Sequence, residues 1–133
     1  MREIKVDKKI TNDLNSLDHC WWFKNQGNVY TQSGRPDYTV LWNGRHYEIE
    51  AKAGNGHPLG MAQLFKGYQI VDAGGVFIVA FPDYTSIKDV PIQKLDVKLH
   101  ADKANRLSVE EYDWLNRLRM QINRQKKTVA FKR

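Results

Sequence analysis

Residues 34–52 have the sequence GRPDYTVLWNGRHYEIEAK, which predicts two β-strands joined by a tight turn. Tyr38–Trp42 is rich in β-branched and aromatic residues, as strands are. Asn43-Gly44 is typical of a two-residue type I′ hairpin turn, because both positions of that turn need a positive φ. We therefore expect a second strand over Arg45–Ala53, antiparallel to the first.

The second strand is predicted to carry charge on one face. Side chains alternate along a strand, so Tyr47, Ile49 and Ala51 share one face and Glu48, Glu50 and Lys52 share the other. Burying unpaired charges is costly, so we expect the charged face to be solvated or to hold a cation.

An acidic residue precedes the first strand. Asp37 follows a proline, and the short turn should bring it close to Glu50 on the neighbouring strand, although the pattern does not give the register. Two carboxylates beside a lysine can bind a hard divalent ion such as Mg²⁺ or Mn²⁺. The lysine, Lys52, would then orient water or stabilise charge on a phosphate.

The ordered set of these residues resembles a nuclease signature. Pro36-Asp37 followed by Glu50-Ala51-Lys52 resembles the motif of the PD-(D/E)XK nuclease superfamily. The wider pattern is similar to the VRR-NUC family in its phage-type stand-alone form. It includes Gly34, Gln63 after a glycine-rich loop, and the apolar run 74–79 that opens a strand.

The resemblance implies roles for particular residues. Asp37, Glu50 and the main-chain carbonyl of Ala51 would ligate Mg²⁺ or Mn²⁺, Lys52 would act on the attacking water or the phosphate, and Gln63 would support them. Family members often add an acid from the first helix. Asp7 fits that position best, although the usual residue is glutamate and Glu3 has a similar spacing.

Composition predicts a single soluble domain with an acidic partner. The 133 residues carry a net charge of +6, which favours nucleic acid because phosphates attract clustered Lys and Arg. A single cysteine, Cys20, excludes an internal disulfide framework and fits a reducing cytoplasm. The family resemblance implies that this cytoplasmic protein is bacterial or phage-encoded. No stretch approaches the ~20 apolar residues of a membrane span.

The remaining patterns predict an α/β (α+β) fold of αβββαβ order, with a mixed sheet flanked by helices and a C-terminal helix. This matches the restriction-endonuclease-like core that the resemblance implies. We treat 1–133 as one nuclease domain, with a core of about 1–84 and a C-terminal helical extension of about 85–133. The expected elements outside the hairpin are a helix to about Leu17, a strand in 19–24, a helix over 60–73, a strand over 76–81 and a helix over 109–124 capped by Ser108. The tail 128–133 is either disordered or a further strand.

The function expected from the resemblance is metal-dependent hydrolysis of phosphodiester bonds in branched DNA, with Holliday junctions as one candidate substrate and a homodimer as the active form. Two alternatives remain open. One is a DNA-binding module that has lost catalysis, and the other is a basic protein-interaction factor. A cleavage assay with and without the metal separates the three.

Overall fold

The computed structural model describes residues 3–25, 34–97 and 107–133. It shows a mixed α+β fold with three helices and a six-stranded sheet, and the predicted order of helix, three strands, helix and strand is confirmed. The elements are α1 (Glu3–Ser16), β1 (Cys20–Lys24), β2 (Tyr38–Trp42), β3 (Arg45–Ala51), α2 (Met61–Asp72), β4 (Val76–Ala80), β5 (Ile92–Lys94), α3 (Val109–Gln125) and β6 (Val129–Lys132).

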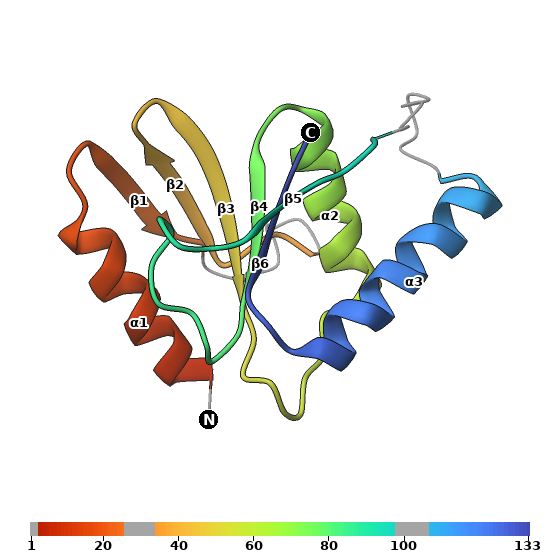
Figure 1. The fold of residues 1–133 in the computed structure, drawn as a ribbon, viewed down its shortest axis with the longest axis horizontal. Coiled ribbons are helices and arrows are strands. Elements are labelled where there is room, and N and C mark those ends of the chain that lie inside the picture. Colours follow the sequence, from red (N-terminus) through yellow and green to blue (C-terminus); the bar gives the residue numbers. More distant parts are fainter. Residues whose placement is uncertain (1–2, 26–33, 98–106) are drawn as a thin grey trace.

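The sheet has the strand order β1-β2-β3-β4-β6-β5 (Figure 1). Strands β1, β2 and β3 are antiparallel to one another, and β3 runs parallel to β4 after the crossover through α2. The predicted hairpin joins β2 to β3, and Asn43 and Gly44 both have the positive φ that its turn requires (51° and 76°). Strand β3 ends at Ala51, two residues earlier than predicted, and Gly54 follows with φ 88°.

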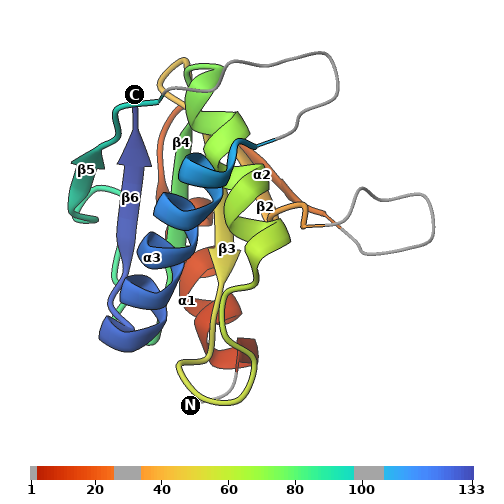
Figure 2. The same ribbon diagram turned by 90° about the vertical axis from the view of Figure 1, so that its right-hand side faces the viewer.

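Helices cover both faces of the sheet (Figures 1 and 2). Helix α1 lies on one face, and α2 and α3 lie on the other. Each helix buries one apolar stripe. The buried stripes comprise Val6, Ile10 and Leu14 of α1, Leu64, Tyr68 and Val71 of α2, and Leu115, Leu118 and Ile122 of α3. Within residues 3–25, 34–97 and 107–133, none of the helices combines the length and apolarity needed to cross a membrane.

The C-terminal part of the chain completes the sheet. Strand β6 lies between β4 and β5, with Phe131 opposite Phe77, so the tail adds a strand. The predicted helical extension over 85–133 therefore also contributes β5 and β6. Residues of β4 are buried along its whole length, because helices cover both faces and strands flank both edges.

Candidate active site

The hairpin register places Asp37 beside Glu50. Tyr38 pairs with Ile49, so the next pair along the two strands is Asp37 and Glu50. The Asp37 carboxylate also crosses to the neighbouring strand, where its Oδ2 accepts a hydrogen bond from the Ala51 backbone N–H at 2.8 Å. The two halves of the motif, Pro36-Asp37 and Glu50-Ala51-Lys52, are therefore joined by this hydrogen bond as well as by strand pairing.

Glu50 is the centre of a set of side-chain contacts. Its Oε1 accepts a hydrogen bond from Gln63 Nε2 at 2.5 Å and lies 3.7 Å from Lys52 Nζ. Lys52 lies two residues further along and so presents its ammonium on the same side as the carboxylate. Asp37, Glu50, Lys52 and Gln63, which sequence reasoning selected, are therefore brought together.

The start of α2 positions Gln63. Its Oε1 accepts a hydrogen bond from the Gly60 N–H at 2.8 Å, so the amide spans from the helix N-terminus to Glu50. Gly34 packs against the same turn. It has φ 81°, and a Cβ built there would lie 2.4 Å from the Ala62 carbonyl oxygen. Only glycine allows that approach, so the segment before Asp37 is held directly against the first turn of α2.

The charged face of β3 is buried, so of the two alternatives expected from the sequence the solvated face is wrong, and the cation-binding face stays a prediction. Glu48, Glu50 and Lys52 are 6%, 3% and 5% exposed. Strand β3 lies inside the sheet, and this face is on the side that α2 covers. An apolar face here would stabilise the fold at least as well, because a buried ion pair often contributes less to stability than well-packed hydrophobic side chains. Charge retained in a central strand is therefore typical of a functional site.

Glu48 belongs to a second polar cluster that the sequence analysis did not assign. Its Oε1 accepts a hydrogen bond from Thr39 Oγ1 at 3.0 Å, and its Oε2 lies 2.7 Å from His46 Nε2. Asn25 Nδ2 in turn donates to Thr39 Oγ1 at 3.0 Å. The signal for this cluster is the spacing of His46 and Glu48 on one strand face, but linking it to Thr39 requires the register.

Asp7 makes its contacts on the α1 side of the sheet. Tyr38 Oη donates a hydrogen bond to Asp7 Oδ1 at 2.5 Å, and Lys24 Nζ lies 3.7 Å from Oδ2. Burial, together with this bond, raises the pKa of the Tyr38 hydroxyl well above its usual value. Asp7 thus ties α1 to β1 and β2, and its place among metal ligands stays a prediction. The side chain of Glu3, the alternative, lies outside the described residues.

The donor set fits a hard divalent cation. Asp37 and Glu50 offer carboxylate oxygens, and Ala51 adds a main-chain carbonyl, which are the ligand types that Mg²⁺ and Mn²⁺ prefer. The part of the chain that the structure describes contains no cluster of three or more His, Cys, Asp or Glu able to hold a metal ion. A metal here would therefore take remaining ligands from water and phosphate oxygens, as Mg²⁺ commonly does.

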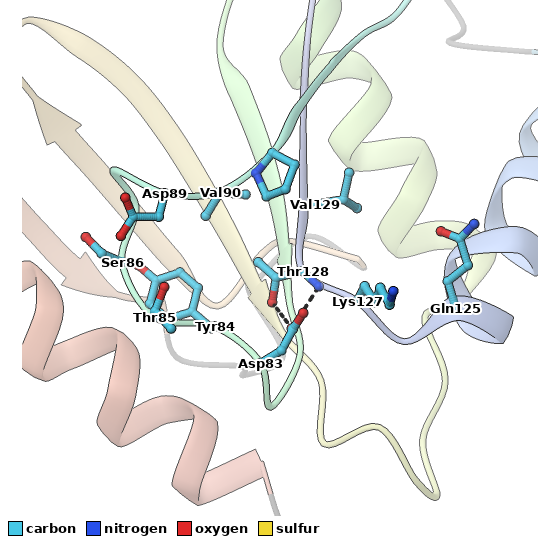
Figure 3. Close-up of a pocket in the computed structure, with 11 residues that line it drawn as sticks. Asp83, Tyr84, Thr85, Ser86, Asp89, Val90, Gln125, Lys127, Thr128 and Val129 are labelled. Carbon is cyan, nitrogen blue, oxygen red and sulfur yellow. Dashed lines mark hydrogen bonds between the residues drawn. The ribbon is translucent and has the colours of Figure 1, made fainter.

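A pocket of about 370 Å³ is lined by the segment between β4 and β5, by Gln125 at the end of α3, and by the chain that leads into β6 (Figure 3). None of the four residues above lines it. Asp83 Oδ1 accepts hydrogen bonds there from the Thr128 N–H at 2.9 Å and from its Oγ1 at 2.6 Å. These bonds fix the entry to β6, so we assign Asp83 a structural role.

Comparisons of this chain with models of protein families, with curated proteins and with solved structures find no match. The case for function therefore depends on the site geometry and on the motif resemblance.

Proposed function

We propose that this protein is a Mg²⁺- or Mn²⁺-dependent DNA endonuclease of the PD-(D/E)XK type, related to the VRR-NUC family. The observation that carries the proposal is the set of contacts around Glu50. Gln63 Nε2 at 2.5 Å and Lys52 Nζ at 3.7 Å converge on one carboxylate oxygen, next to Asp37 in the register. A buried charged cluster of this composition has little structural benefit, which supports a role in chemistry.

The proposed reaction is hydrolysis of a phosphodiester bond. A water oxygen forms a bond to phosphorus and loses a proton, the bond to the leaving oxygen breaks, and the leaving oxygen takes up a proton, so the net reaction adds one water across the bond. The divalent ion, when bound, lowers the pKa of water and neutralises charge on the phosphate. Asp37 and Glu50 would hold the ion together with the carbonyl of Ala51.

Lys52 and Gln63 have supporting roles in this scheme. The Lys52 ammonium would orient the attacking water or stabilise the added negative charge of the pentacovalent phosphate. Its position 3.7 Å from a Glu50 oxygen supports this role, because Glu50 is one of the proposed ligands of the ion. Gln63 keeps the Glu50 carboxylate in place through its bond to Oε1, and its second bond to Gly60 keeps Gln63 itself in one orientation.

The proposed substrate is branched DNA, with a four-way (Holliday) junction as one candidate, and the proposed active form is a homodimer. The net charge of +6 supports a polyanionic partner. A two-fold dimer would present two active sites with the symmetry of a four-way junction. These points extend the motif resemblance and are separate from the chemistry of the site.

A cleavage panel tests the proposal. Linear, flap, splayed and four-way DNA of equal length are incubated with the protein in EDTA, Mg²⁺ or Mn²⁺, beside Asp37→Asn and an exposed-acid control, Asp89→Asn. We expect metal-dependent cuts on branched DNA by the wild type and the control, and none by Asp37→Asn. Tight DNA binding without cuts would favour an inactive binding module. Weak, salt-insensitive DNA binding would favour a protein-interaction factor.

A further inference from the structure

Three large apolar side chains are exposed at the β1 edge of the sheet. Trp21 is 58% exposed, Phe23 37% and Leu41 44%, and we call these three residues the β1 aromatic patch. The rings of Trp21 and Phe23 meet edge to face, with centroids 5.2 Å apart. Strand β1 is an edge strand, so the patch lies at the solvent-exposed edge of the sheet. Exposed aromatic side chains grouped in this way mark interaction surfaces.

The patch shares a sheet face with the candidate active site. Trp21 pairs with Leu41, and Phe23 pairs with Thr39. Side chains of paired residues lie on one face, and every second residue along a strand returns to it. The Thr39–Glu48 hydrogen bond of 3.0 Å confirms that this face continues from β2 onto β3.

Along this face, the patch lies close to the predicted metal ligands. Asp37 directly precedes β2 and lies two residues before Thr39, which corresponds to about 7 Å of extended chain. Phe23, opposite Thr39, is therefore about one nucleotide spacing from the predicted metal ligands. Trp21 and Leu41 lie one further step away in the same direction.

The register shows which polar side chains share the face of the patch. His46 pairs with Leu41 and Glu48 pairs with Thr39, whereas Lys24 pairs with Tyr38 and Arg45 with Trp42, so these two cations lie on the α1 face. The chain carries a net charge of +6, which favours an anionic partner. Bases of a single DNA strand stack on exposed aromatic side chains, and this face leads from the patch to the candidate active site.

We propose that the β1 aromatic patch binds the bases of an unpaired DNA strand whose backbone leads to Asp37 and Glu50. The inference rests on the proposed nuclease function and narrows its substrate to DNA with unpaired nucleotides beside the cut. Bases of a continuous duplex are stacked on each other and cannot lie on Trp21 and Phe23. At a flap, fork or open junction, the unpaired bases are available for this contact.

The area of the patch argues against a second copy of the chain as its occupant. The three side chains expose on the order of 300 Å², given the usual area of aromatic residues. A stable dimer interface needs about 800 Å² on each partner. The patch alone is thus too small for a dimer, whereas two stacked bases need no larger surface.

The test measures binding without cleavage. Dissociation constants are determined in EDTA by fluorescence anisotropy, for a labelled 12-nucleotide single strand and for a hairpin duplex with 12 base pairs. The variants are Trp21→Ala, Trp21→Ala/Phe23→Ala, and the control Tyr112→Ala, an exposed aromatic on α3. Trp21→Ala is included because a side chain exposed to 58% contributes little to folding.

We expect the double variant to bind the single strand at least tenfold more weakly and the duplex less than twofold more weakly. Trp21→Ala should show a smaller loss of the same kind, and Tyr112→Ala should match the wild type. Equal losses on both DNAs, or none in either variant, would overturn the inference. So would a loss of dimer in sedimentation with unchanged strand binding, which would assign the patch to a second copy.

The two proposals fail separately in these experiments. If the protein cuts no DNA with any metal but the patch variants lose single-strand binding, the nuclease proposal fails and the strand-binding surface stands. If cleavage depends on Asp37 but the patch variants bind like the wild type, the nuclease proposal stands and the patch has another role.

Discussion

The buried pair of Glu50 and Lys52 allows a quantitative test of why this strand carries charge. We consider Glu50→Gln, Lys52→Met and the double variant, measured without metal. Each substitution keeps the side chain's approximate size, and glutamine keeps an oxygen for the bond from Gln63. At 3.7 Å the charges attract by about 4–5 kcal/mol at an effective dielectric constant near 20, before the cost of taking both out of water.

Removing one partner leaves the other charge buried. Glu50 and Lys52 are 3% and 5% exposed, so each single variant should lose about 3 kcal/mol of unfolding free energy. That loss corresponds to a melting temperature about 10 °C lower in a domain of this size. The double variant should regain most of it, because no uncompensated charge remains.

Urea and thermal unfolding followed by circular dichroism measure this cycle. The reasoning is refuted if both single variants and the double variant all lie within about 0.5 kcal/mol of the wild type. It is also refuted if the double variant loses as much as the two single variants together, because the charges would then be uncoupled.

Three further predictions concern Gly34, Tyr84 and Gln63. Gly34→Ala should destabilise the fold by about 1–3 kcal/mol more than Gly44→Ala in urea unfolding, because both have positive φ but only Gly34 would clash with α2. Burial raises the pKa of Tyr84 above its unfolded value, aided by a hydrogen bond to a carboxylate, so its stabilising contribution is present below about pH 10 and is lost as pH rises further. Unfolding free energy measured from pH 8 to 11 should therefore fall by up to about 1.4 kcal/mol per pH unit more in the wild type than in Tyr84→Phe. Gln63→Leu should lower the cleavage rate by about tenfold or more while DNA binding stays within twofold, since Gln63 acts through Glu50.

Local patterns were sufficient to predict much of this fold. The β-branched residues of Tyr38–Trp42 and the Asn43-Gly44 turn gave correct bounds for β2 and the turn, since hairpin geometry depends on neighbouring residues. The capping box at Ser108 correctly marked the start of α3. These signals are short in range, so one sequence is enough to read them.

Long-range pairing was not predictable. The insertion of β6 between β4 and β5 depends on contacts such as Phe77 with Phe131, more than fifty residues apart, and nothing in the tail's own pattern specifies its partner. The burial of the charged face of β3 was not predicted, for a related reason. Its alternation is that of a half-exposed strand, but α2 covers it, and the charges are accommodated by one another and by Gln63.

The most direct test of the central claim is the single-turnover cleavage rate of Lys52→Ala on the best-cut DNA in saturating Mg²⁺. Binding is measured in parallel in EDTA, and Lys88→Ala, an exposed lysine, is the control. We predict a rate lower by about 30- to 1,000-fold, the value of one group that stabilises transition-state charge, with binding within twofold of the wild type. A Lys52→Ala protein that cuts at the wild-type rate would contradict the assignment of this cluster as the catalytic centre.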